Sequence, residues 1–210
     1  MEIHPQLMKV IELIDNEFQF PLNYHDCSEI VRRLCCNFAN GETRWCFWFE
    51  NVDEVIKIPR FDGDRDFDYC KRELHNYKLA QHYRVEAVLL PIHYVGCFGG
   101  SDIYVQPKFT YANSDLSHRQ YKELKEKLGS AKKSRAMRKS WNKLYYCMDD
   151  AWYARVLQLY GKKFLASFEQ FSNEVQLNDL HNGNIGWRNG RPIILDYAGY
   201  QGHRNVQLSI

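Results

Sequence analysis

The stretch Asp179-Leu-His-Asn-Gly-Asn184 is followed, twelve residues after its last member, by Asp196 in the run Ile194-Leu-Asp-Tyr-Ala-Gly199. Asp and Asn side chains supply the carboxylate and amide oxygens that Mg²⁺ accepts as ligands in proteins. Phosphoryl transfer from a nucleotide needs such ligands, and it also needs a carboxylate that orients the acceptor hydroxyl. The same residue types are typical of a turn without chemistry. The rest of the chain has to decide between these two interpretations.

Composition limits the class of protein. The 210 residues are 26% charged and 45% hydrophobic, which is typical of a soluble globular chain and excludes collagen, coiled coil and wholesale disorder. The net charge of +2 does not favour a nucleic acid as a partner. No apolar run reaches the roughly 20 residues of a membrane helix. Seven scattered cysteines without a Cys-x-x-Cys pair argue against a disulfide framework, so we expect a cytoplasmic protein.

The first half reads as a helical lead-in followed by β-strands. Helical sequence extends to about Leu34, and a further strand around residues 30–38 is expected to turn at Asn40-Gly41. Aromatic and β-branched runs predict strands, and a period of three to four from Phe67 predicts a helix. The expected strands cover residues 44–49, 54–58, 88–95 and 102–109, the last two joined at Gly99-Gly100.

The second half is mainly helix-forming. Residues 117–173 lack strand signals, and apolar side chains within residues 149–171 recur every three or four positions, with Gly161 as a possible division. A short buried strand is expected at residues 192–195, with Asp196 at its end. A β-rich part followed by a helix-rich part predicts an α+β fold.

The two motifs of the second half resemble those of a known superfamily. Asp-Leu-His-x-Gly-Asn followed by Ile-Leu-Asp-Tyr-x-Gly is similar to the catalytic loop and metal-binding loop of protein-kinase-like enzymes. His181 resembles the aminoglycoside phosphotransferase branch and some bacteriophage-encoded kinases. By this resemblance Asp179 would be the catalytic base, and Asn184 and Asp196 would be the metal ligands.

The first half resembles the nucleotide-binding part of the same superfamily. Lys57, in the run Val-Ile-Lys-Ile-Pro, is similar to the lysine that grips the nucleotide phosphates, and Glu73 lies sixteen residues later, like the glutamate that pairs with it. Gly41 is the one glycine of residues 35–45, where the superfamily has a glycine-rich phosphate loop. The resemblance implies that Gln106, Lys108 and Phe109 form the hinge against which adenine packs.

The resemblance implies a two-lobed kinase-like fold. Residues 1–109 would be the N-lobe, with the helical lead-in, an antiparallel five-stranded sheet and one inserted helix, and they would bind the nucleotide. Residues 110–210 would be a truncated, mainly helical C-lobe with the catalytic and metal-binding loops. Eleven residues follow Gly199, which is where a typical member continues into its substrate platform. The implied cofactors are ATP and Mg²⁺.

The function expected first is a kinase that transfers the γ-phosphoryl group of ATP to a hydroxyl, with protein Ser/Thr favoured as the acceptor. One alternative is a catalytically reduced kinase-like protein that acts by binding a partner protein, and another is a small-molecule phosphotransferase. The basic segment 131–143 is a candidate docking site for a protein substrate or partner. A kinase with so short a C-lobe would suit a phage or a bacterium. Neither a membrane nor a nucleic acid is expected as a partner.

Overall fold

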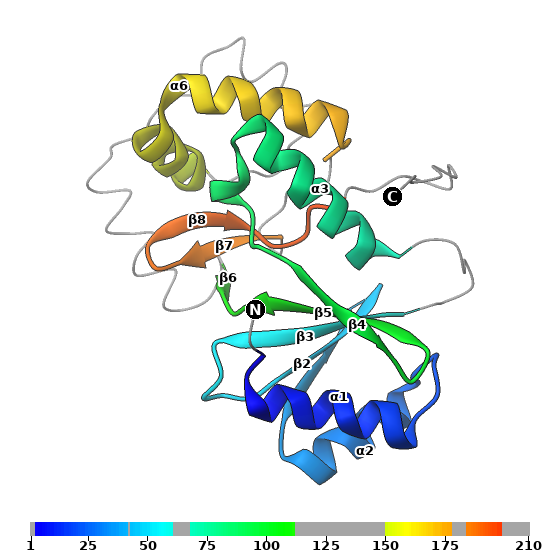
Figure 1. Cartoon of the computed structure of the whole chain (residues 1–210). Helices are drawn as coiled ribbons and strands as arrows, with labels where there is room; N and C mark the ends of the chain where they lie inside the picture. The colour runs from blue at the N-terminus through cyan, green and yellow to red at the C-terminus, as the bar shows by residue number, and fades with distance from the viewer. Residues whose placement is uncertain (1–2, 42, 61–67, 112–149, 178–183, 199–210) are drawn as a thin grey trace. The chain divides into compact units, whose positions relative to one another are not determined.

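The computed structural model describes residues 3–41, 43–60, 68–111, 150–177 and 184–198 (Figure 1). The chain forms two compact units. The first unit is residues 1–74 with 91–108, and the second is residues 75–90 with 109–210. The described part is α+β, as predicted from the sequence.

The first unit opens with two helices. Helix α1 spans Pro5–Glu17, and its N-terminus is capped by His4, whose ring accepts a hydrogen bond from the Gln6 N–H. Helix α2 spans Tyr24–Leu34 and begins at a reciprocal capping box between Asn23 and Asp26. The predicted helical lead-in is therefore confirmed. The strand expected around residues 30–38 is wrong in its first half, because α2 continues to Leu34.

A five-stranded antiparallel sheet follows, in the order β1-β2-β3-β5-β4. The predicted hairpins at Asn40-Gly41 and Gly99-Gly100 are confirmed, because β1 pairs with β2 and β4 pairs with β5. The strand predicted over 88–95 begins later, since a short 3-10 helix, η1, occupies Glu86–Val88. The strands are β1 (Asn37–Asn40), β2 (Arg44–Trp48), β3 (Glu54–Pro59), β4 (His93–Phe98) and β5 (Ser101–Pro107).

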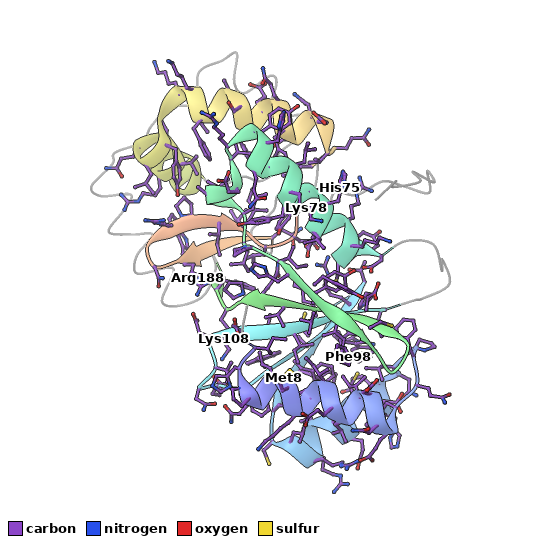
Figure 2. The ribbon with its side chains drawn as sticks, in the orientation of Figure 1. Met8, His75, Lys78, Phe98, Lys108 and Arg188 are labelled. Atoms are coloured by element: carbon purple, nitrogen blue, oxygen red, sulfur yellow. The ribbon has the colours of Figure 1, made fainter. Side chains whose placement is uncertain are left out.

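The two faces of this sheet differ in chemistry. Alternate side chains of a strand point to opposite faces. On one face, Phe47, Ile56 and Val105 pack against α1 and α2 in the largest apolar core of the described residues. Met8 of α1 and Phe98 of β4 pack against the same core from its margin (Figure 2). The other face presents polar side chains of β2, β3 and β5, and it positions the first part of the candidate site.

Helix α3 spans Tyr69–Tyr83, which confirms the predicted helix, and the division between the units falls within it, after Leu74. The second unit also contains α6 (Asp150–Glu174), which breaks at Gly161 (φ 77°), as the sequence predicted. A three-stranded sheet in the order β6-β7-β8 completes it. Its strands are β6 (Thr110–Tyr111), β7 (Ile185–Arg188) and β8 (Arg191–Ile194).

No helix within the described ranges is long and apolar enough to cross a membrane. The sequence-based expectations for residues 112–149 fall outside those ranges.

Candidate functional site

The side chains of Lys57 and Glu73 meet in the first unit. Lys57 lies in β3 between Ile56 and Ile58, so its side chain points to the polar face of the sheet. Its Nζ donates to Glu73 Oε2 on α3 over 3.1 Å. Lys57 is 7% exposed and Glu73 is fully buried. Buried charges of this kind are retained only when they are paired. The structure therefore brings together two residues that were predicted from different elements.

Arg44 forms a second ion pair with the same carboxylate. Its Nη1 lies 2.7 Å from Glu73 Oε1, and its side chain is 7% exposed. Arg44 opens β2, and the pairing of Cys46 with Lys57 puts Arg44 on the polar face of the sheet as well. Each oxygen of Glu73 thus faces one cation. The sequence analysis missed Arg44, because only the strand register reveals that it shares a face with Lys57.

The N-terminus of α3, which holds Glu73, is fixed by Asp68. Asp68 Oδ1 accepts hydrogen bonds from the N–H groups of Cys70 (2.8 Å) and Lys71 (3.0 Å), which is the arrangement of an N-cap. Its Oδ2 accepts from the Tyr104 hydroxyl of β5 over 2.9 Å. Burial raises the pKa of the Asp68 carboxyl, against the lowering effect of these hydrogen bonds. Asp68 ties the start of α3 to the sheet.

The other predicted nucleotide-binding residues have separate positions. The Gly41 N–H donates to the Arg44 carbonyl over 3.0 Å, so this amide is used within the β1–β2 turn. Lys108 Nζ donates to the carbonyls of Phe49 and Glu50, at the opposite end of β2 from Gly41. Figure 2 shows Lys108 at the end of β5. Lys108 is thus engaged by the β2–β3 turn, and its role toward a nucleotide stays a prediction.

Gln106 and Phe109 differ in their surroundings. Gln106 is 1% exposed within β5 and belongs to the first unit. Phe109 belongs to the second unit, where it packs against Leu90, Ile193 and Leu195. The contact of Gln106 and Phe109 with adenine stays a prediction.

A hairpin in the second unit places the backbone of Asn184 beside Leu195, the residue before Asp196. Strands β7 and β8 pair with Ile185 opposite Ile194, and the Leu195 N–H donates to the Asn184 carbonyl over 2.9 Å. Asp196 is the next residue. The hairpin turns at Asn189-Gly190, where both residues have positive φ, 52° and 71°. This is the typical signature of a type I′ turn, and this Asn-Gly pair is the sequence signal that could have predicted the hairpin.

The chain after Asp196 is held by two buried side chains. Asn76 of α3 donates through Nδ2 to the Tyr197 carbonyl over 2.7 Å and lies 3.4 Å from the Ala198 carbonyl. The Tyr197 hydroxyl donates to the Leu90 carbonyl over 2.6 Å. Asn76 is 3% exposed and Tyr197 is fully buried. The sequence analysis missed both residues.

Two of the predicted features cannot be placed. Asp179 and the basic segment 131–143 lie outside the described residues. Within the described part of the chain, no cluster of three or more His, Cys, Asp and Glu side chains is arranged to hold a metal ion. Asn184 and Asp196 offer an amide and a carboxylate, which match the oxygen ligands of Mg²⁺ in chemistry.

Comparison with solved structures gives a weak likeness. No protein-family model and no curated protein matches the chain. Among solved structures it is similar to a spectinomycin phosphotransferase in complex with ADP and spectinomycin, at 14% identity and a TM-score of 0.33. The match covers 84% of this chain and 71% of the other. At these values the likeness establishes neither a shared fold nor a shared activity.

Proposed function

We propose that this protein is an ATP- and Mg²⁺-dependent phosphotransferase that moves the γ-phosphoryl group to a hydroxyl. The observation that supports this best is the buried ion pair between Lys57 and Glu73, 3.1 Å apart. The desolvation of a buried ion pair often costs as much as the attraction returns, so stability alone is a weak reason for this pair. The charge of Lys57 suits the phosphate groups of a nucleotide.

The second unit would supply the metal ligands. Asn184 directly precedes β7 and Asp196 lies two residues after the end of β8, and their oxygens are of the kind that a hard dication accepts. They would hold Mg²⁺, which neutralises phosphate charge when it is bound. Asp179 would accept the proton of the acceptor hydroxyl. In this proposal Lys57 would contact the phosphates of the nucleotide, and Asn184 and Asp196 would hold the metal ion that accompanies them.

The acceptor is proposed as a hydroxyl, with protein Ser/Thr as the first class to test. A small alcohol is the second class, because the proposed base, lysine and metal ligands serve either acceptor equally. The basic segment 131–143 remains a proposed docking site for an acidic protein.

Calorimetric titration with MgATP tests the nucleotide site. The parent protein is expected to bind saturably, and Lys57→Met should weaken binding roughly ten- to a hundredfold, since a charged hydrogen bond is lost. Lys78→Met is the matched control, because Lys78 is an exposed lysine of α3 (Figure 2). A folded parent protein that binds no MgATP, or equal losses in the two variants, would contradict the proposal.

A further inference from the structure

Asn76 is a buried polar residue for which the proposed chemistry provides no role. Its side chain is 3% exposed, and its amide group lies against the carbonyls of Tyr197 and Ala198. These two residues directly follow Asp196 in the chain. Asn76 is 121 positions away in sequence from Tyr197, so the contact joins α3 to a distant part of the chain, the segment that directly follows Asp196.

The geometry of this contact restrains the backbone. Strand β8 ends at Ile194, and the Leu195 N–H makes the next hydrogen bond, to Asn184. The carbonyls of Tyr197 and Ala198 lie beyond that point, in a buried segment where carbonyl groups require a donor. A carboxamide has two N–H donors on one nitrogen. One Asn76 side chain therefore acts on two successive peptide groups.

The restraint extends to Asp196 itself. The Ala198 N–H lies 3.4 Å from Asp196 Oδ1, so the carboxylate is linked to the same segment that Asn76 holds. The Tyr197 hydroxyl also holds the segment, through its hydrogen bond to the Leu90 carbonyl. If the Tyr197 and Ala198 peptide groups rotated, the Ala198 N–H would move away from the Asp196 carboxylate, and the carboxylate would lose that hydrogen bond.

We propose that Asn76 is a positioning residue for Asp196: by hydrogen-bonding the two carbonyls that follow, it holds the carboxylate in one orientation for a divalent cation. The part of this inference that concerns the cation rests on the proposed function. The restraint on the backbone is independent of the proposed function, and a separate measurement tests it.

The test combines hydrogen exchange with metal binding in the full chain. Asn76→Asp keeps the size of the side chain but removes the donor, and Asn76→Leu removes all polar atoms at similar volume. Asn16→Asp is the matched control, because Asn16 also donates to a backbone carbonyl, that of Glu12, but at an exposed position. Backbone amide exchange at residues 195–198 is followed by NMR, and Mn²⁺ affinity is followed by titration.

Both Asn76 variants should exchange the amides of residues 197 and 198 faster by on the order of tenfold, with a similar loss of Mn²⁺ affinity, while Asn16→Asp should match the parent. Unchanged exchange in a folded variant would overturn the inference. If neither variant folds, hydrogen exchange of the side-chain amide protons in the parent protein tests the inference. Slow exchange of the Asn76 carboxamide protons supports the restraint, and exchange as fast as that of the Asn16 carboxamide overturns it.

The two proposals can fail separately. A parent protein that binds neither Mn²⁺ nor MgATP, with exchange that responds as expected, overturns the proposed function and leaves the backbone restraint in place. A parent protein that binds both, with unchanged exchange and metal affinity in the Asn76 variants, overturns only the role of Asn76.

Discussion

Glu73 is the residue on which the first part of the candidate site depends. It is fully buried, and its two oxygens contact two cations, Lys57 and Arg44. A buried carboxylate that loses a partner is left with an uncompensated desolvation cost, which is larger than the gain of any exposed pair. Arg44 is therefore expected to matter for stability as well as for the position of Glu73.

Replacement of Arg44 tests this expectation. Arg44→Met should lower the free energy of unfolding by about 3–5 kcal/mol, the usual cost of removing one partner of a buried ion pair, and Arg44→Lys should recover part of the loss. Arg32→Met is the control, because the Arg32 side chain is 72% exposed in its pair with Glu29 and should contribute little. Urea denaturation measures all three, and equal losses for Arg44→Met and Arg32→Met would contradict the account.

Asp68 predicts a pH dependence with a definite sign. Burial raises the pKa of its carboxyl in the folded state above the ordinary value of 3.8. Between that value and the raised pKa the folded state keeps a proton that the unfolded state has lost. The contribution of Asp68 to stability is therefore greatest below pH 3.8, and it falls as the pH rises through the folded pKa.

The variant Asp68→Asn removes this titration and keeps a residue that caps helices well. The free energy of unfolding of the variant, relative to the parent, should rise as the pH increases above 3.8 and then level off. Denaturation at a series of pH values measures the difference. If the free energies of unfolding of the two proteins changed in parallel with pH, the pKa of the Asp68 carboxyl would not be raised in the folded state.

At the scale of elements, the β7–β8 hairpin places Asn184 beside the segment that contains Asp196. A two-residue type I′ turn requires positive φ at both central positions, and Gly190 adopts 71° there. Among the described residues other than its two chain neighbours, no atom lies within 4 Å of a Cβ built at Gly190, so a substitution meets backbone strain but no steric clash with them.

Gly190→Ala should therefore cost about 1–2 kcal/mol of stability, the penalty of the left-handed region for a residue with a Cβ. Asn189→Gly should change stability much less, because glycine also accepts that conformation. The free energies of unfolding of both variants, measured in urea, check the prediction. A Gly190→Ala variant as stable as the parent would mean that the turn has another geometry.

The elements also show how far sequence reasoning extends. Apolar alternation and a period of three to four predicted β2, β3, β5, α3 and the break at Gly161, because these patterns are local. The start of β4 was predicted too early, since residues 86–88 form a 3-10 turn. Arg44 and Asn76 could not be predicted. Arg44 shares a face of the sheet with Lys57 only because of the register between β2 and β3. Asn76 contacts Tyr197, which lies 121 positions away in the sequence.

At the scale of the whole molecule, the chain divides into two units, and each contains its own group of predicted site residues. The first contains the Lys57–Glu73 pair and the second contains Asn184 and Asp196. The predicted boundary at residues 109 and 110 and the lobe assignments stay predictions. The motif of the catalytic loop remains a sequence argument, because Asp179 lies outside the described residues.

The central claim is transfer of a phosphoryl group from ATP. The most direct measurement incubates the parent protein and Asp179→Ala with γ-labelled ATP and Mg²⁺, in the presence of a bacterial lysate or of small hydroxyl compounds. The account predicts labelled product with the parent, and a rate lower by about 10²–10⁴ with Asp179→Ala, while MgATP affinity stays the same. Equal rates for the two proteins, or a folded, MgATP-bound parent that labels no acceptor of either class, would contradict it.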